Sequence, residues 1–318
     1  MITGSRGLSI LYNFLEKFKA DANYTILLPS NICHDVFFLI QYLKMPYIFI
    51  DINIRDYCIN QEMTIKHLKK CKKSILIFNH SYGIPTVPYA FFLEIRNISP
   101  TVVIIDDRCL CTPTMETNID DNCIDLILYS TGYGKQVDLA GWGFGFVGDS
   151  FCMNMLQVTF KKHKYLELKN SFYKNFLNYL PDNDSELDCI HVSNNIDDIE
   201  PNYYERLIAL EVEKWRIHKS TIIDIYKSTL PIEIQLISEM NNWRFNIIVN
   251  KKDAILTELF RNNLFASNHY ASIGTMQHKH DCRVADQLHQ SIINLFIDKY
   301  YTQEKAEKTV SIIRKYLT

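Results

Sequence analysis

The chain has 318 residues, 47% of them hydrophobic and 22% charged, so it can bury a large core as one α/β unit or as two domains. Its 34 basic and 36 acidic residues give a net charge of −2 without a basic patch, which argues against nucleic acid as a partner. Nine cysteines without a C-x-x-C pair, a charged N-terminal segment and only short apolar runs predict a soluble cytoplasmic protein with no signal peptide and no membrane span.

The first 150 residues alternate between strand patterns and helix patterns. Each predicted strand is short and apolar throughout, and each predicted helix repeats its apolar residues every three or four positions. This order is typical of an α/β protein with a mostly parallel central sheet covered by helices on both faces. We predict helices over 7–19, 31–44, 61–72 and 87–97, and strands over 24–29, 46–51, 74–80, 101–106 and 125–130.

The pattern changes after Gly148. Residues 151–180 look helical, 181–200 form a polar, acidic loop, and 203–227 read as one long helix. A new unit begins after Pro231, with a strand over 243–249 and helices over 252–264, 284–298 and 303–317. We therefore predict a large domain over residues 1–230 and a small C-terminal α+β domain over 231–318.

Six of the ten glycines lie between Gly132 and Gly148, in a stretch whose single lysine is Lys135. Glycine occurs where the backbone bends unusually or comes close to another group. Lys135 follows the strand over 125–130, and Asp107 follows the strand over 101–106. Ligands bind at the carboxyl ends of parallel strands, so this amine and this carboxylate are predicted to face one crevice and a cofactor whose electronics both tune. The alternative is two strand-end residues that are solvated separately.

Two weaker patterns also suit ligand binding. The segment TGSRG places Gly4, Ser5 and Arg6 ahead of the first helix, where free N–H groups suit a phosphate, although many serine-capped helices bind nothing. The run HKHDC offers His278, His280 and Cys282 to a metal but no fourth ligand, so these are predicted to be surface residues.

The order of several motifs resembles the DegT/DnrJ/StrS sugar aminotransferases, which are fold-type I pyridoxal-phosphate enzymes. That family has a Gly–Ser/Thr helix start, an H-x-(Y/F)-G-x-P turn, an acidic pair at a strand end, and a lysine motif before a glycine-rich strand. The resemblance covers residues 1–150 well and 200–318 more loosely. The matching segments are GSRGLSILYNFL, LLPSNICHDV, HSYGIPT, VVIIDD and, most specific, STGYGK followed by GWGFGFV.

The resemblance implies a role for each matching residue. Lys135 would join pyridoxal 5'-phosphate as a Schiff base and then move a proton between the substrate and the cofactor. Asp107, the second acid of its pair, would contact the pyridinium nitrogen, while Asp106 points to the other face of the strand. The phosphate would be held by Ser130 and by the backbone of Gly4, Ser5 and Arg6. The resemblance also implies a homodimer.

The same resemblance implies the reaction. We expect an amino group to move from an amino acid to a keto sugar that is carried on a nucleotide, in surface-glycan synthesis. The expected amino donor is L-glutamate. A diphosphate would need positive charge at the crevice mouth, for which Arg6, Arg108 and Arg244 are candidates. His269 and Tyr270, in the small domain, would close over the sugar and hydrogen-bond its hydroxyl groups.

Some positions depart from the family. In the family, the aspartate is followed by small residues and then by Gln or His, which contacts the ring hydroxyl; this sequence has Arg108, Cys109 and Leu110 instead. A ring-stacking aromatic residue is usual in the family where this sequence has Cys33 and His34. These departures keep two alternatives open. One is another pyridoxal-phosphate reaction on the same fold, as in a lyase, a dehydratase or a decarboxylase. The other is a catalytically silent relative that acts as a binding protein.

Overall fold

The computed structural model describes residues 1–148, 199–276 and 281–317, together with single positions between 151 and 174. The helix predicted over 151–180 and the loop predicted over 181–200 lie almost wholly outside the described residues, and so do His278 and His280. The elements of the first part are β1 (Ile2–Gly4), α1 (Gly7–Glu16), β2 (Tyr24–Pro29), α2 (His34–Leu43), β3 (Tyr47–Ile50), α3 (Gln61–Leu68), β4 (Lys73–Asn79), α4 (Tyr89–Ile98), β5 (Val103–Asp107), β6 (Leu126–Ser130) and β7 (Gly143–Val147).

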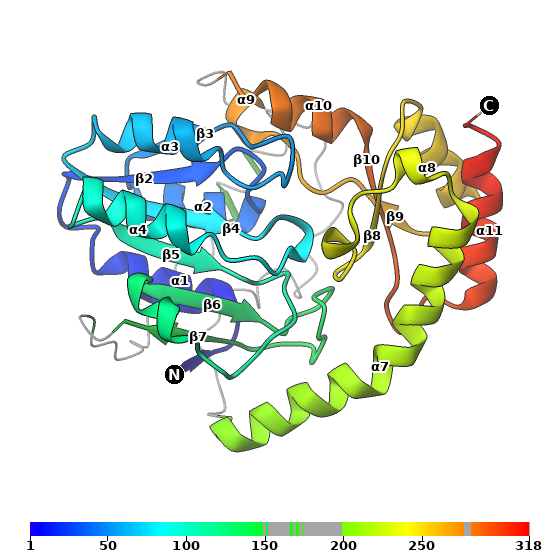
Figure 1. Cartoon of the computed structure of the whole chain (residues 1–318), viewed down its shortest axis with the longest axis horizontal. Coiled ribbons are helices and arrows are strands. Elements are labelled where there is room, and N and C mark those ends of the chain that lie inside the picture. Colours follow the sequence, from blue (N-terminus) through cyan, green and yellow to red (C-terminus); the bar gives the residue numbers. More distant parts are fainter. Residues whose placement is uncertain are drawn as a thin grey trace.

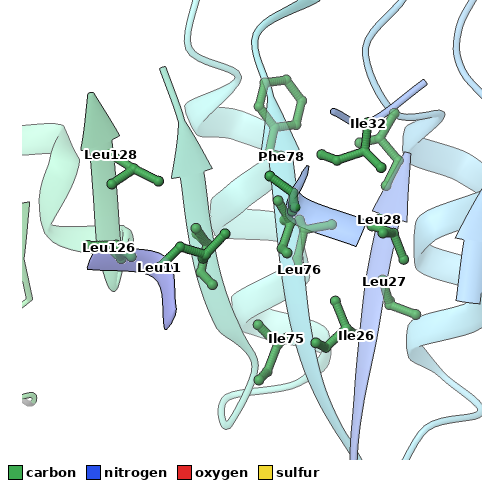
Figure 2. Close-up of a cluster of buried hydrophobic side chains, with 14 of the residues drawn as sticks. Leu11, Ile26, Leu27, Leu28, Ile32, Ile75, Leu76, Phe78, Leu126 and Leu128 are labelled. Carbon is green, nitrogen blue, oxygen red and sulfur yellow. The ribbon is translucent and has the colours of Figure 1, made fainter. Parts of the chain in front are cut away.

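Seven strands form one sheet in the order β1-β7-β6-β5-β4-β2-β3. The five strands from β2 to β6 run parallel, β7 is antiparallel to β6, and β1 is antiparallel to β7. The central strands are buried at consecutive positions, so both faces of the sheet are covered, as predicted. Figure 2 shows this core, in which Leu11 of α1 and side chains of β2, β4 and β6 lie together.

The helices form a layer on each side of the sheet. Helix α1 packs against α2 and against β6 and β7, whereas α3 packs against α4. Helices α1 and α2 are apolar over most of their length because each faces the sheet: α1 buries eight of its ten residues. This mostly parallel α/β architecture confirms the predicted fold class.

The second part forms a smaller sheet with its own helices (Figure 1). Its strands are antiparallel in the order β8-β10-β9. The helix predicted over 284–298 is wrong in its second half, because residues 292–295 form the central strand of this sheet. Four consecutive buried residues carry no periodicity that separates a strand from a helix. The elements are α7 (Pro201–Thr229), β8 (Phe245–Ile248), α8 (Lys252–Arg261), β9 (Ala266–Ser267), α9 (Ile273–Met276), α10 (Arg283–Ser291), β10 (Ile292–Leu295) and α11 (Gln303–Arg314).

Helix α7 contributes to two hydrophobic cores. Tyr204 and Ile208, near its start, pack into the core of the large sheet, whereas Ile222 and Tyr226, near its end, pack into the core of the small sheet. In Figure 1, α7 runs from below the large sheet to the side of α11. The domain boundary between residues 230 and 231 stays a prediction.

The segment that contains α9 and α10 returns to the large sheet. The Asp51 carboxylate, which follows β3, accepts hydrogen bonds from the backbone N–H groups of Val284 and Ala285 at 2.9 and 3.0 Å, and so caps α10. The Ser30 and Ser272 hydroxyl groups are 3.0 Å apart. Cys282 is buried there, so the prediction that it is a surface residue is wrong. These contacts bring residues 268–271 and His289 to the ends of β2 and β5.

Candidate active site

A cavity of about 650 Å³ lies at the carboxyl ends of β2, β5 and β6. Its walls on the large-sheet side come from the start of α1, from the residues that follow β2, and from the loop that contains Lys135. The second part of the chain closes the cavity with residues on three separate segments. Ligands bind at this edge in open α/β sheets, so the position agrees with the crevice predicted from the sequence. The lining residues from the second part are Trp243, Arg244, Asn268, His269, Tyr270, Ala271 and His289.

Lys135 lies in a loop that several hydrogen bonds hold in place. Its backbone N–H donates to the Gly132 carbonyl at 3.1 Å, and the Trp243 indole N–H donates to the Gly134 carbonyl at 2.7 Å. Gly134 has a φ of +71°, which L-residues with a side chain rarely adopt. The side chain of Lys135 is half-buried in the wall of the cavity, and within the described ranges its amine has no ion-pair partner.

The neighbouring acids at the end of β5 face different surroundings. Asp107 is half-buried and lines the cavity, and one of its carboxylate oxygens accepts the Cys109 backbone N–H at 3.0 Å. Asp106 is fully buried on the opposite side of the strand. Because side chains alternate along a strand, only Asp107 can reach a ligand in the cavity. The structure therefore places Asp107, and not Asp106, with Lys135.

Asp106 belongs to a group of four buried charged residues, His80, Asp106, Arg108 and Asp121, which we call the ion cluster. His80 Nε2 lies 2.8 Å from Asp106 Oδ1, and Arg108 Nε donates to Asp106 Oδ2 at 2.6 Å. Arg108 Nη2 donates to Asp121 Oδ1 at 2.9 Å. Burial opposes ionisation, but His80 and Arg108 outweigh it and hold the pKa of Asp106 below its usual range. Arg108 is therefore ion-paired on the side of β5 that faces away from the cavity. The prediction that it lies at the crevice mouth is wrong.

Four residues around the start of α1 and the end of β6 form what we call the anion cradle, namely Arg6, Gly7, Ser130 and Gly132. Arg6 is 8% exposed, and its Nε and Nη1 atoms are buried without a hydrogen-bond acceptor among the described residues. A Cβ on Gly132 would lie 2.6 Å from Arg6 Nη1, and a Cβ on Gly7 would lie 3.2 Å from the Cys109 sulfur. A buried, unpaired guanidinium beside a helix N-terminus suits a phosphate group.

The structure places the three residues that were predicted to bind the phosphate, Gly4, Ser5 and Arg6, in different surroundings. Gly4 ends β1 and pairs with Gly143, and the Ser5 hydroxyl donates to the Ser9 hydroxyl at 3.3 Å. Only Arg6 of the three is among the residues that line the cavity, where it is followed by Gly7. The sequence reasoning missed Gly7, although a glycine at the first position of a predicted helix is a signal of close approach.

His269 and Tyr270 both line the cavity, as predicted for a loop of the second part. The His269 backbone is fixed at both polar atoms, because its N–H donates to Asn294 Oδ1 at 2.7 Å and its carbonyl accepts the Tyr82 hydroxyl at 2.9 Å. The Tyr270 ring stacks on the Trp243 ring with an interplanar angle of 9°. The sequence reasoning did not identify Trp243, which joins this loop to the Lys135 loop.

Comparison with known proteins gives structural matches only. No family model matches the chain, and no curated protein sequence matches it. The aminotransferase PseC of Helicobacter pylori, involved in the biosynthesis of pseudoaminic acid, is 13% identical with a TM-score of 0.67, over 99% of this chain and 86% of that one. A DegT/DnrJ/EryC1/StrS aminotransferase from Brucella abortus is 14% identical with a TM-score of 0.65, over 99% and 85%. NtdA from Bacillus subtilis, with bound pyridoxamine phosphate (PMP), is 14% identical with a TM-score of 0.67, over 98% and 73%.

These matches extend over almost the whole chain, from the large sheet to the small one. The protein therefore has the fold of the DegT/DnrJ/EryC1/StrS-type aminotransferases, and the structural resemblance expected from the sequence motifs is confirmed.

Proposed function

We propose that the protein is a pyridoxal-phosphate-dependent aminotransferase that transfers an amino group from an amino acid to a keto sugar. The observation that carries this proposal is Lys135, whose amine lines a cavity together with Asp107 and the anion cradle. The amine, the carboxylate and the anion cradle match three polar groups of pyridoxal phosphate, namely its aldehyde, its ring nitrogen and its phosphate. When bound, this group supplies an electron-withdrawing ring that stabilises negative charge on the carbon next to the transferred amine.

The residues of the cavity would bind the cofactor and transfer the proton. The Arg6 guanidinium and the N–H groups at the start of α1 would hold the phosphate, together with the Ser130 hydroxyl. The Asp107 carboxylate would keep the ring nitrogen protonated. Lys135 Nζ would hold the cofactor covalently and, once released from it, would accept and return a proton.

The substrate class is proposed from the proteins that share the fold. PseC acts in the biosynthesis of pseudoaminic acid, and this supports a sugar acceptor. We propose L-glutamate as the donor and a nucleotide-linked keto sugar of surface-glycan synthesis as the acceptor. His269 and Tyr270 line the same cavity and offer polar groups to sugar hydroxyls. We propose a cytoplasmic location, and none of the described helices is long and apolar enough to cross a membrane.

The donor half of the reaction tests the proposed activity. Protein loaded with pyridoxal phosphate should lose its yellow colour with L-glutamate and release one equivalent of 2-oxoglutarate. A lyase or a decarboxylase would instead release ammonia or carbon dioxide, and a silent relative would leave the colour unchanged. The acceptor half is tested by adding 3-keto and 4-keto nucleotide sugars and simple 2-oxo acids to the PMP form. Return of the colour with the 2-oxo acids alone would reject the sugar acceptor.

We also propose that the working form is a homodimer, as in the family that the sequence motifs resemble. Light scattering at the protein concentration of the assay should give twice the chain mass of 37.3 kDa. A monomer that retains the cofactor tightly would contradict the dimer without touching the proposed reaction.

A further inference from the structure

Arg244 is a buried cation that forms no ion pair with any residue that the structure describes. Only 9% of the residue is exposed. Asp298 acts on Arg244 through space, but the two do not come within ion-pair distance. Burial lowers the pKa of Arg244 to about 10, so the guanidinium is still charged at neutral pH. A buried charge without a partner is costly, and a bound anion would remove that cost.

The guanidinium is held in one orientation. It lies over the Trp243 ring, with Cζ 4.4 Å from the centroid, and over the Phe296 ring at 3.9 Å. Its Nη1 donates to the Ser267 hydroxyl, which donates to Asn294 Oδ1 at 3.1 Å. Side chains that are fixed in this way bind a ligand without further loss of conformational entropy.

Arg244 also lies beside the loop that contains Lys135. Its Nη2 is 4.0 Å from the point where a Cβ on Gly134 would be, and Gly134 directly precedes Lys135. The neighbouring Trp243 is hydrogen-bonded to the Gly134 carbonyl. Arg244 and Lys135 line the same cavity. An anion on Arg244 is therefore close to the amine that the proposed reaction uses.

We propose that Arg244 binds the carboxylate of the amino-acid donor, and of the 2-oxo acid that leaves, and so positions the amine to be transferred next to Lys135. In a 2-amino acid the carboxylate and the amine are attached to the same carbon, so the carboxylate site must be within a few ångströms of the reacting lysine. A nucleotide diphosphate is separated from a ring ketone by several bonds and would bind farther away. The planar fork of an arginine also matches a carboxylate with two parallel hydrogen bonds.

This proposal rests on the proposed function, and its test uses binding to the cofactor-loaded protein instead of turnover. The probe is 2-oxoglutarate, which does not react with the pyridoxal form, measured by calorimetry. Arg244→Gln should weaken its binding at least about 30-fold, because the carboxylate loses a buried charged partner. Arg244→Lys, which keeps the charge but not the fork, should weaken it about tenfold. Arg261→Gln removes a charge at the end of α8, where the side chain is 73% exposed, and should change nothing.

The second probe is uridine diphosphate, whose binding to Arg244→Gln should equal that to the unmodified protein. A loss confined to uridine diphosphate, or equal 2-oxoglutarate binding in Arg244→Gln and unmodified protein, would overturn the carboxylate assignment. Borohydride trapping of the cofactor at Lys135 is measured on every variant. If borohydride traps no cofactor on the unmodified protein, the proposed function fails and this inference fails with it. If the cofactor is trapped normally and Arg244→Gln also binds 2-oxoglutarate normally, only this inference fails. If Arg244→Gln does not fold by circular dichroism, Arg244→Lys decides.

Discussion

Two groups of charged residues lie on opposite sides of β5, and they differ in whether each charge has an oppositely charged partner. In the ion cluster behind the strand, each charge has a partner in the protein: Asp106 contacts two cations, and Arg108 contacts two acids. In the cavity on the other side, Arg6 and Arg244 are just as buried but form no ion pair among the described residues. Burial alone therefore does not separate a structural arginine from a binding one. The difference is the ion-pair partner, which Arg6 and Arg244 lack among the described residues, and this supports the proposal that both bind anionic ligands.

The largest effect is expected from Lys135→Ala. Transfer of the amino group should fall at least about 10³-fold, because the variant lacks both the covalent link and the proton carrier. The melting temperature should change little, since the amine has no ion-pair partner in the described structure. Lys227→Ala, on the exposed side of α7, is the matched control for loss of a lysine. Retained transfer in Lys135→Ala would contradict the proposed role.

Asp106→Asn tests the ion cluster. The free energy of unfolding should fall by about 3–5 kcal/mol, because His80 and Arg108 lose a buried partner. Chemical denaturation measures this, with the exposed Asp224→Asn as control. The pKa of Asp106 is lowered in the folded state, so its contribution is present above its ordinary pKa of about 3.9 and is lost as the pH falls. The free energies of unfolding of Asp106→Asn and of the unmodified protein should therefore converge as the pH falls. A difference that stays constant with pH would count against this assignment.

Asp107→Asn should show the opposite balance. Asparagine can still accept the Cys109 N–H, so the free energy of unfolding should change by less than about 1 kcal/mol. The rate of the glutamate half-reaction should fall about 10²-fold, because the ring nitrogen loses its anionic partner. Stopped-flow absorbance measures the rate. A variant that loses stability but keeps the rate would mean that Asp107 is the structural acid of the pair.

The smallest effect is expected from Gly132→Ala. The new Cβ would lie 2.6 Å from Arg6 Nη1 and would displace the guanidinium, so the Kd for pyridoxal phosphate should rise about tenfold. Gly141→Ala is a matched control in the same loop, because its Cβ would meet only a carbonyl oxygen at 3.9 Å. Fluorescence titration with the cofactor compares the two. Equal affinities would remove Arg6 from the phosphate site.

The sequence predicts the parts of the site that depend on local order. Asp107 and Lys135 follow strands whose apolar pattern is clear, and alternation along β5 separates Asp107 from Asp106. The partners of Arg108 could not be predicted, because Asp121 is 13 residues away in a segment without a pattern. The closure of the cavity by residues 268–271 and His289 depends on Asp51, which caps α10 across a sequence separation of 233 and 234 residues. Contacts of that range come from packing, which a single sequence does not show.

The central claim is that Lys135 is the lysine that holds the cofactor. The most direct measurement is borohydride reduction of the unmodified protein with pyridoxal phosphate, followed by peptide mapping. Among the lysines that the structure describes, Lys219 is the strongest rival, because burial lowers its pKa and it lines a smaller cavity that also includes Lys135. We predict one modified residue per chain, at Lys135. An adduct on Lys219, or no stable adduct, would contradict the claim.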